Sequence, residues 1–130
     1  MAAKISYVIA FLLGLGMIFI GAQFLLSPEA AEAGYGIHFS EHGDYSFHYI
    51  KGIRDIFSGL LLCTFVLLNE RRALAVTLLA GTIIPITDML IVLSKSYNGV
   101  QDAIKHIIAI IICSVCGIIL LATKSSRKTL

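Results

Sequence analysis

The chain has 130 residues, of which 58% are apolar and 14% are charged, with a formal net charge of +2. Its mean hydropathy of +0.90 lies far outside the range of soluble domains and indicates an integral membrane protein. The small positive charge excludes the strongly basic surface of a nucleic-acid-binding protein, so we expect the lipid bilayer as a partner and no nucleic acid.

The first apolar segment, residues 5–26, is long enough to cross the hydrocarbon core as a helix. A cleaved signal peptide is the alternative, because Lys4 supplies a positive flank and residues 31–33 resemble a small-residue cleavage site. The apolar run has about twenty residues, whereas the apolar region of a signal peptide has roughly 7–15. The length therefore favours a membrane span.

A short helix is predicted directly after this span. Ser27 would be its N-cap, Pro28 its first residue and Gly34 its stop, with acidic residues in the first turn. The connection continues to His48 with several aromatic and histidine side chains and is too apolar to extend freely into water. We expect it to form a cap at the membrane interface or over the outer end of the bundle.

Three further apolar segments follow, at residues 49–68, 73–93 and 104–123, each close to the ~20 residues that a membrane span needs. The short connections between them force neighbouring spans to run antiparallel. The predicted fold class is therefore all-α, with residues 1–130 forming one domain: an antiparallel bundle of four membrane helices.

The distribution of Lys and Arg predicts the orientation of this bundle, because these residues are retained on the cytoplasmic side of a membrane. Most of them flank the predicted inner ends of the spans: Lys4, Arg71, Arg72, Lys124, Arg127 and Lys128. Residues 27–48 contain none. We expect both termini in the cytoplasm and the first loop outside, in a plasma membrane or a bacterial inner membrane.

Polar side chains within the spans gather near the predicted outer surface. A rise of 1.5 Å per residue places them in one layer, roughly 5–10 Å below the outer boundary. The candidate pocket residues in this layer are Gln23, Lys51, Arg54, Asp55, Asp88 and His106. Ionisable groups at this depth are costly in lipid, so these side chains should face the bundle interior or its outer opening.

Helical spacing places the polar residues of the second and third spans on one face of each helix, which supports an inward direction for both faces. One stripe on the second span follows i, i+3, i+4, i+7 spacing: Lys51, Arg54, Asp55 and Ser58. A stripe on the third span ends at Asp88 and contains Pro85, which removes a helical hydrogen bond from the carbonyl of Gly81. A kink just below Asp88 should open space there. On the first span, small residues should permit close helix approach and direct Gln23 inward.

Several segments together resemble an uncharacterised family of small membrane proteins, domain of unknown function 4267, within the wider DoxX-like group. The segments are residues 26–31, 51–59 and 81–88, with His106 after them. The resemblance implies a membrane bundle of four helices and implies no reaction. Members of the wider group act variously as respiratory-chain accessory subunits, cargo receptors and chaperones, so fold analogy alone does not assign a function.

The polar layer has two interpretations. Arg54, Asp55 and Asp88 could form a buried ion-pair network that only fixes the helices, with Arg54 paired to Asp88. Alternatively, the layer is a pocket in which Asp55 or Asp88 exchanges protons, Arg54 or Lys51 holds a polar ligand group, and His106 acts as an acid or base. Sequence does not separate these interpretations.

Other sites have weaker support. The histidines and acids of residues 38–48 have loose spacing for a metal site, and His106 has no facing histidine within the spans for haem. The pair Cys113 and Cys116 lies in mid-helix, where thiols usually behave as small apolar groups. We therefore predict no metal and no cofactor. A multidrug transporter of this size would carry a carboxylate on its first helix, and a channel would continue the polar lining inward.

Two functions remain. The protein is a non-catalytic accessory or assembly subunit, whose partner is another membrane protein or a second copy. Alternatively, it binds a small amphiphile, such as a quinone or a lipid, near the outer leaflet, and catalysis there would isomerise or protonate it. The first hypothesis fits so small a chain slightly better, and sequence leaves open whether the protein is an enzyme.

Overall fold

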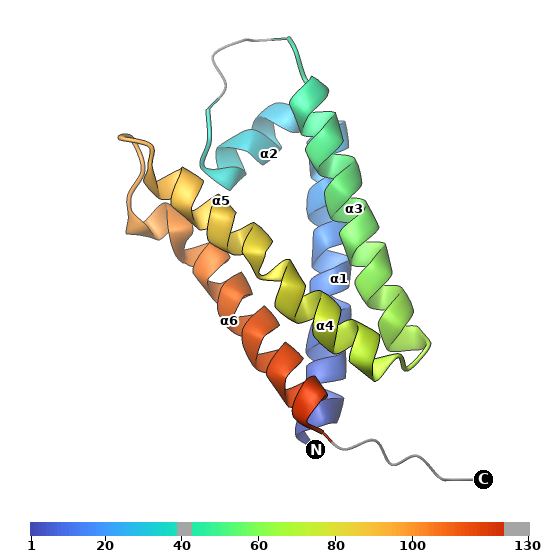
Figure 1. Cartoon of the computed structure of the whole chain (residues 1–130). Helices are drawn as coiled ribbons and strands as arrows, with labels where there is room; N and C mark the ends of the chain where they lie inside the picture. The colour runs from blue at the N-terminus through green and yellow to red at the C-terminus, as the bar shows by residue number, and fades with distance from the viewer. Residues whose placement is uncertain (39–42, 124–130) are drawn as a thin grey trace, which may run out of the picture.

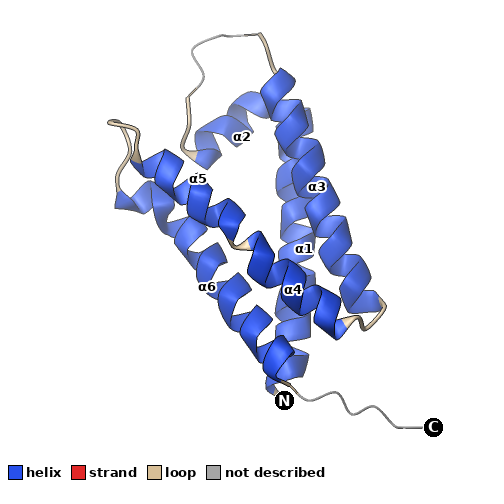
Figure 2. Cartoon of the chain, viewed as in Figure 1, coloured by secondary structure: helices blue, strands red, loops and turns tan. Residues whose placement is uncertain are grey.

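The structure is a computed structural model that describes residues 1–38 and 43–123. Its described part contains only helices and the connections between them (Figure 2). The six helices are α1 (Ala2–Leu26), α2 (Pro28–Tyr35), α3 (Ser46–Leu67), α4 (Arg71–Gly81), α5 (Ile83–Leu93) and α6 (Val100–Ala122). The predicted all-α class is confirmed. Three helical segments are long and apolar enough to cross a membrane: Ala2–Leu26, Arg71–Leu93 and Val100–Ala122.

The fourth long helix, α3, has 22 residues but carries Lys51, Arg54 and Asp55 in its first half. These charges distinguish α3 from the other long segments. Along the chain, α1, α3, the α4–α5 segment and α6 alternate in direction (Figure 1). The start of α1 and the end of α6 lie together at one end of the molecule, and α2 lies at the opposite end (Figure 1).

Helices α1 and α3 form a tightly packed pair because glycines face each other at two levels. A Cβ atom on Gly14 would lie 2.9 Å from the carbonyl oxygen of Gly59, and one on Gly52 would lie 2.7 Å from that of Gly21. No real side chain tolerates such distances to backbone atoms. The seven-residue separation on both helices repeats the contact two turns apart, so the backbones stay close along the pair.

The second pair is formed by α6 with α4 and α5. Gly117 of α6 lies against Leu79 and the carbonyl of Ala75 on α4, so these two backbones also approach closely. Between α4 and α5 the helix is interrupted at Thr82. The cause is Pro85, which lacks the N–H that would bond to the Gly81 carbonyl four residues earlier. The helix is therefore interrupted just below Asp88, where the sequence predicts a kink.

The two pairs contact each other at the end near the termini and diverge towards the other end (Figure 1). The core joins them in the closed half: Ala10, Leu62, Leu74, Ala75, Leu78, Cys113, Cys116 and Leu120. In the open half, α3 diverges from α5, and α2 lies across the gap (Figure 1).

The short helix α2 was predicted with one error. Ser27 occupies the N-cap position, although its side chain makes no capping hydrogen bond, and Pro28 is the first helical residue. The helix ends at Tyr35, and its C-cap is Gly36, which adopts a left-handed conformation with φ 89°; the predicted stop was Gly34. Gly34 lies within the helix and does not have a positive φ. Gly36 does, and a position with positive φ strongly favours glycine.

We predict that the α1–α3 glycines determine stability. Gly59→Ala and Gly52→Ala should each lower the free energy of unfolding by about 1–3 kcal/mol, because the new methyl group overlaps backbone atoms of α1. Gly16→Ala is the matched control, since a Cβ there meets no described atom within 4 Å. Thermal unfolding in mild detergent would compare the three variants. Equal midpoints for Gly59→Ala and Gly16→Ala would contradict the close contact.

Candidate functional site

A cavity of about 480 Å³ occupies the space between the two helix pairs. All six helices contribute side chains to its wall. The half near the core is lined by apolar groups, among them Leu13, Met17, Leu62 and Leu78. The half under α2 contains the polar groups Gln23, Tyr35, Lys51, Asp55, Ser58, Asp88, Lys105 and His106. The cavity therefore has a polar end and an apolar end.

Of the six residues predicted from the sequence to form a polar pocket, five line this cavity. They are Gln23, Lys51, Asp55, Asp88 and His106. The third-span stripe, residues 77, 81, 85 and 88, lines it as well. The structure thus brings the predicted layer together around one cavity, and the function of that cavity stays a prediction.

Arg54 is the exception. Its side chain is exposed and is not part of the cavity wall. The predicted pairing of Arg54 with Asp88 is wrong, because the ion pairs within the described chain are His48–Glu32 and Lys51–Asp55. Three residues along a helix correspond to 300° of rotation, so Arg54 lies on the flank of the stripe that Lys51 and Asp55 occupy. From the flank, its long side chain extends outward.

Lys51 is held at the polar end by three neighbours. Its Nζ donates to Oδ2 of Asp55 at 2.8 Å. The side chain of Lys51 is 15% exposed and that of Asp55 is 14% exposed. The same ammonium lies 5.0 Å from the ring centre of Phe24 and 4.6 Å from that of Tyr35. Aromatic faces attract cations, so the rings and the carboxylate together fix the position of the charge.

Asp88, Tyr35 and His106 form the second polar group. The ring of Tyr35 meets the ring of His106 edge to face, with 5.2 Å between centres. Burial, followed by the hydrogen bond with the Asp88 side chain, raises the pKa of Tyr35 above its ordinary value. The hydroxyl therefore remains a donor towards this carboxylate. His106 is only 6% exposed, and its Nε2 atom has no hydrogen-bond partner within residues 1–38 and 43–123.

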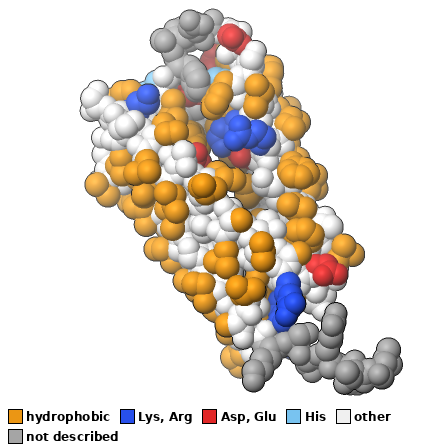
Figure 3. All heavy atoms as spheres, viewed as in Figure 1, with side chains coloured by type: hydrophobic (Ala, Val, Ile, Leu, Met, Phe, Trp, Pro, Cys, Tyr) orange, Lys and Arg blue, Asp and Glu red, His pale blue; other side chains and the backbone are white. Residues whose placement is uncertain are grey.

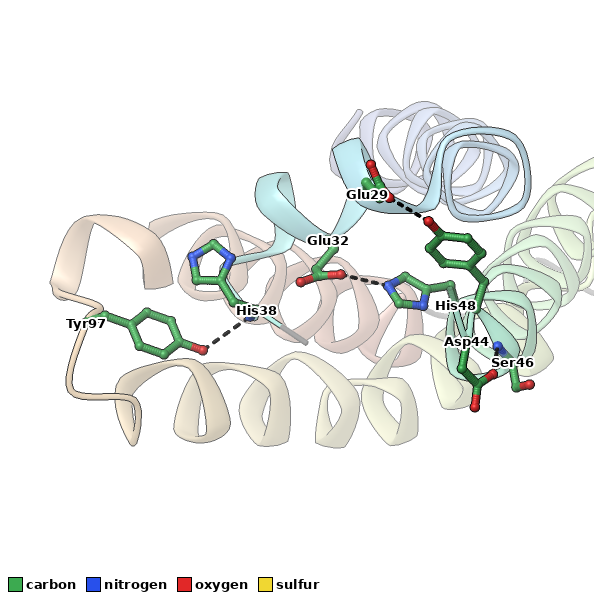
Figure 4. Close-up of polar contacts among 8 residues, drawn as sticks. Glu29, Glu32, His38, Asp44, Ser46, His48 and Tyr97 are labelled. Carbon is green, nitrogen blue, oxygen red and sulfur yellow. Dashed lines mark hydrogen bonds and ion pairs between the residues drawn. The ribbon is translucent and has the colours of Figure 1, made fainter. Parts of the chain in front are cut away.

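The helix α2 covers the polar end and is held at its first half by α3 and the residues before it. The Tyr45 hydroxyl donates to Glu29 at 2.5 Å, and Nε2 of His48 lies 3.0 Å from Oε2 of Glu32 (Figure 4). Both acids point from α2 towards these partners (Figure 4). Beside them, the Asp44 carboxylate accepts from the backbone N–H of Ser46.

The other end of α2 is held by α6 and the connection before it. Asn98 donates to the carbonyl of Gly36 at 2.6 Å, and Lys105 donates to the carbonyl of Gly34. The hydroxyl of Tyr97 accepts from the backbone N–H of His38 at 3.2 Å (Figure 4). Sequence reasoning did not assign roles to Tyr35, Asn98 or Lys105, because their contacts join segments about 60 to 70 residues apart.

The side of the molecule on which α3 and α5 diverge faces the viewer in Figure 3. Basic and acidic side chains gather near the centre of this face, and hydrophobic side chains are spread over the rest of it (Figure 3).

Metal and thiol chemistry have little geometric support. Among the described residues, no three His, Cys, Asp or Glu side chains are placed to bind one ion. Glu41 and His42, which the metal hypothesis included, lie outside the described residues. Cys63, Cys113 and Cys116 are buried free thiols.

The fold and the cavity define a small all-helical protein with the characteristics of a membrane protein and a polar pocket covered by a short helix. The family model for the domain of unknown function DUF4267 matches residues 14–120. The chain therefore belongs to this family, and the match includes every polar residue of the cavity wall. No curated protein and no solved structure matches the chain.

We predict that Lys51 and Asp55 are energetically coupled and that Arg54 is not. Lys51→Met leaves a largely buried carboxylate unpaired and should cost about 3–5 kcal/mol of unfolding free energy, much of which the double variant Lys51→Met/Asp55→Leu should restore. Arg54→Leu, the control from the same helix, should change stability by at most about 0.5 kcal/mol. Thermal unfolding in detergent would compare the wild type, Lys51→Met, Asp55→Leu, the double variant and Arg54→Leu. A loss in the double variant equal to the sum of the two single losses would refute the coupling.

Proposed function

We propose that the chain is a four-span membrane protein of the DoxX-like group, with α3 as the fourth span. The charges of α3 do not oppose this assignment, because Lys51 and Asp55 neutralise each other beside the cavity and Arg54 extends from the flank. The alternating directions of the long helices support an antiparallel bundle (Figure 1). We place both termini in the cytoplasm and α2 at the outer surface, since Lys and Arg concentrate at the terminal end.

Single cysteines would test this orientation. Ala33→Cys on α2 and Arg72→Cys at the start of α4 both replace exposed residues, whereas the native thiols are buried. In intact cells, an impermeant maleimide should label position 33 and leave position 72 unlabelled until the cells are permeabilised. The parent chain controls for the native thiols. The reverse pattern would show that the orientation is inverted.

We propose further that the protein binds a small amphiphile from the outer leaflet. The observation that supports this function is the cavity itself. Its volume falls within the 300–1,000 Å³ of typical ligand pockets, its wall is mainly apolar, and its polar groups converge at one end. Nε2 of His106 adds support: it has no hydrogen-bond partner within residues 1–38 and 43–123, and a buried polar atom without a partner costs free energy that a ligand could recover.

The accessory-subunit hypothesis remains a prediction without a specific observation in its favour. A layer that only held the helices together would be expected to pair its charges and to close the space between them. Here a cavity lies beside Asp88 and His106 instead. Proton transfer between these two residues and a bound molecule also stays a prediction, because binding does not require it.

Filling the cavity provides the test of binding. Gly81 lines the cavity, and a Cβ there would meet no described atom within 4 Å, so Gly81→Phe should place a ring in the ligand space without displacing backbone. Gly16→Phe is the matched control, since Gly16 is equally open but lies outside the cavity wall. Mass spectrometry of lipids retained after purification in mild detergent should find a species with the wild type and with Gly16→Phe, and at least tenfold less with Gly81→Phe.

If all three proteins retain the same molecules in equal amounts, the cavity is not the binding site. Unfolding midpoints for the two phenylalanine variants would accompany the analysis, so that loss of ligand is not confused with loss of fold.

A further inference from the structure

The polar end of the cavity offers a ligand both hydrogen-bond donors and acceptors. Its two ammonium groups, which carry three N–H donors each, are held in place by one hydrogen bond each: Lys51 donates to Asp55, and Lys105 donates to the carbonyl of Gly34. Ser58 donates to the backbone carbonyl of Arg54. The Asp88 carboxylate lines the cavity together with Tyr35 and has room for further donors, because an ionised carboxylate accepts about four hydrogen bonds.

His106 supplies a second group with unused capacity. It lines the cavity and is buried, and its Nε2 atom has no partner within the described part of the chain. This atom is itself enclosed, so a ligand hydroxyl reaches it only when neighbouring side chains shift. In a neutral imidazole this atom either donates or accepts, depending on the tautomer. A hydroxyl group can satisfy both cases, because its oxygen accepts and its hydrogen is donated. The carbonyl oxygen of a ketone or an ester only accepts, so it satisfies Nε2 only in the tautomer in which this atom donates.

The charge of the wall selects against an ionic head group. Its ionised side chains are two lysines and two aspartates, Lys51, Lys105, Asp55 and Asp88, so their formal charges cancel. A bound carboxylate, phosphate or ammonium would introduce an uncompensated charge into a mostly apolar space, where the cost of desolvation is high. A neutral head group avoids this cost.

We propose that the cavity selects neutral lipid alcohols, with the hydroxyl group at Asp88 and His106 and the hydrocarbon part directed towards Leu13, Met17, Leu62 and Leu78. This inference depends on the proposed amphiphile binding and specifies its ligand class. The hydroxyl donates to the carboxylate of Asp88 and exchanges a second hydrogen bond with Nε2 of His106. The apolar residues in the other half of the cavity cover the chain.

Four probes with the same alkyl chain separate the head-group chemistries: 1-tetradecanol, tetradecyl methyl ether, tetradecanoate and tetradecylammonium. Each would be titrated into the full-length wild type in mild detergent at pH 8, with binding followed as a thermal shift. A fluorogenic maleimide provides the signal, because Cys63, Cys113 and Cys116 are buried in the folded protein and become reactive on unfolding. Affinities are compared as mole fractions in the micelle.

The alcohol should bind at least about tenfold more tightly than the ether, because a hydrogen bond to a charged acceptor contributes about that factor or more. It should also bind more tightly than both ions. Equal binding of all four probes, or preference for an ion, would overturn the head-group inference and leave amphiphile binding intact. Binding of none of them, together with no retained lipid in the wild type, would overturn the proposed function itself.

Two variants assign the selectivity to the residues named. Asp88→Leu should reduce the preference for alcohol over ether to near unity while binding of the ether persists. His106→Phe preserves a flat ring against Tyr35 and should lower the preference several-fold, so it keeps the test decisive if Asp88→Leu does not fold. Arg54→Gln, outside the cavity, is the control and should retain the wild-type ratio. An unchanged ratio in both Asp88→Leu and His106→Phe would refute the assignment.

Discussion

The close approach of α1 and α3 is the constraint on which the rest of the structure depends. Two reciprocal glycine contacts, Gly14 with Gly59 and Gly21 with Gly52, keep these backbones together from the closed half of the molecule to the open half. Since α3 follows α1 throughout, it cannot also follow α5 as that helix diverges. The α4–α5 segment instead stays with α6, and the space left between the two pairs becomes the cavity.

The polar groups of the cavity are stable at their positions because most of them have partners from another element. Lys51 combines an ion pair with two aromatic contacts, and Lys105 is bonded to the end of α2. Asp88 and His106 differ from them: both side chains line the cavity, and Nε2 of the buried His106 ring has no partner within the described residues. Groups left partly unsatisfied in an otherwise paired environment are the ones from which ligand recognition is expected.

Much of this arrangement could be predicted from the sequence. Hydropathy and turn residues located every helix within a few residues, and Pro85 predicted the break that separates α4 from α5. Depth along the spans grouped five residues that do line one cavity. Depth and spacing depend only on the sequence of a single helix. They therefore suffice to predict the helix positions, the break near Pro85 and the polar layer.

The errors have a common physical origin, because they concern contacts between elements or fine rotation about one. Helical spacing defines a face only to within about 60°, which was too coarse to separate Arg54 from Lys51. Tyr35 was counted only as an aromatic residue of the cap, since its position against His106 and Asp88 depends on where α2 docks. Gly36, and not Gly34, caps the end of α2 in a left-handed conformation, and its carbonyl accepts from Asn98, a residue 62 positions away.

The length of the short helix α2 also sets the distance between the two helix pairs at their open end. It is joined to α1 through the single residue Ser27, and its far end is fixed to Asn98 and Lys105 of the opposite helix pair. Eight helical residues at 1.5 Å each span about 12 Å, so the length of α2 sets how far apart the two pairs stand at their open end. An inserted or deleted turn would change that width by about 5 Å, and with it the girth of any molecule that fits below.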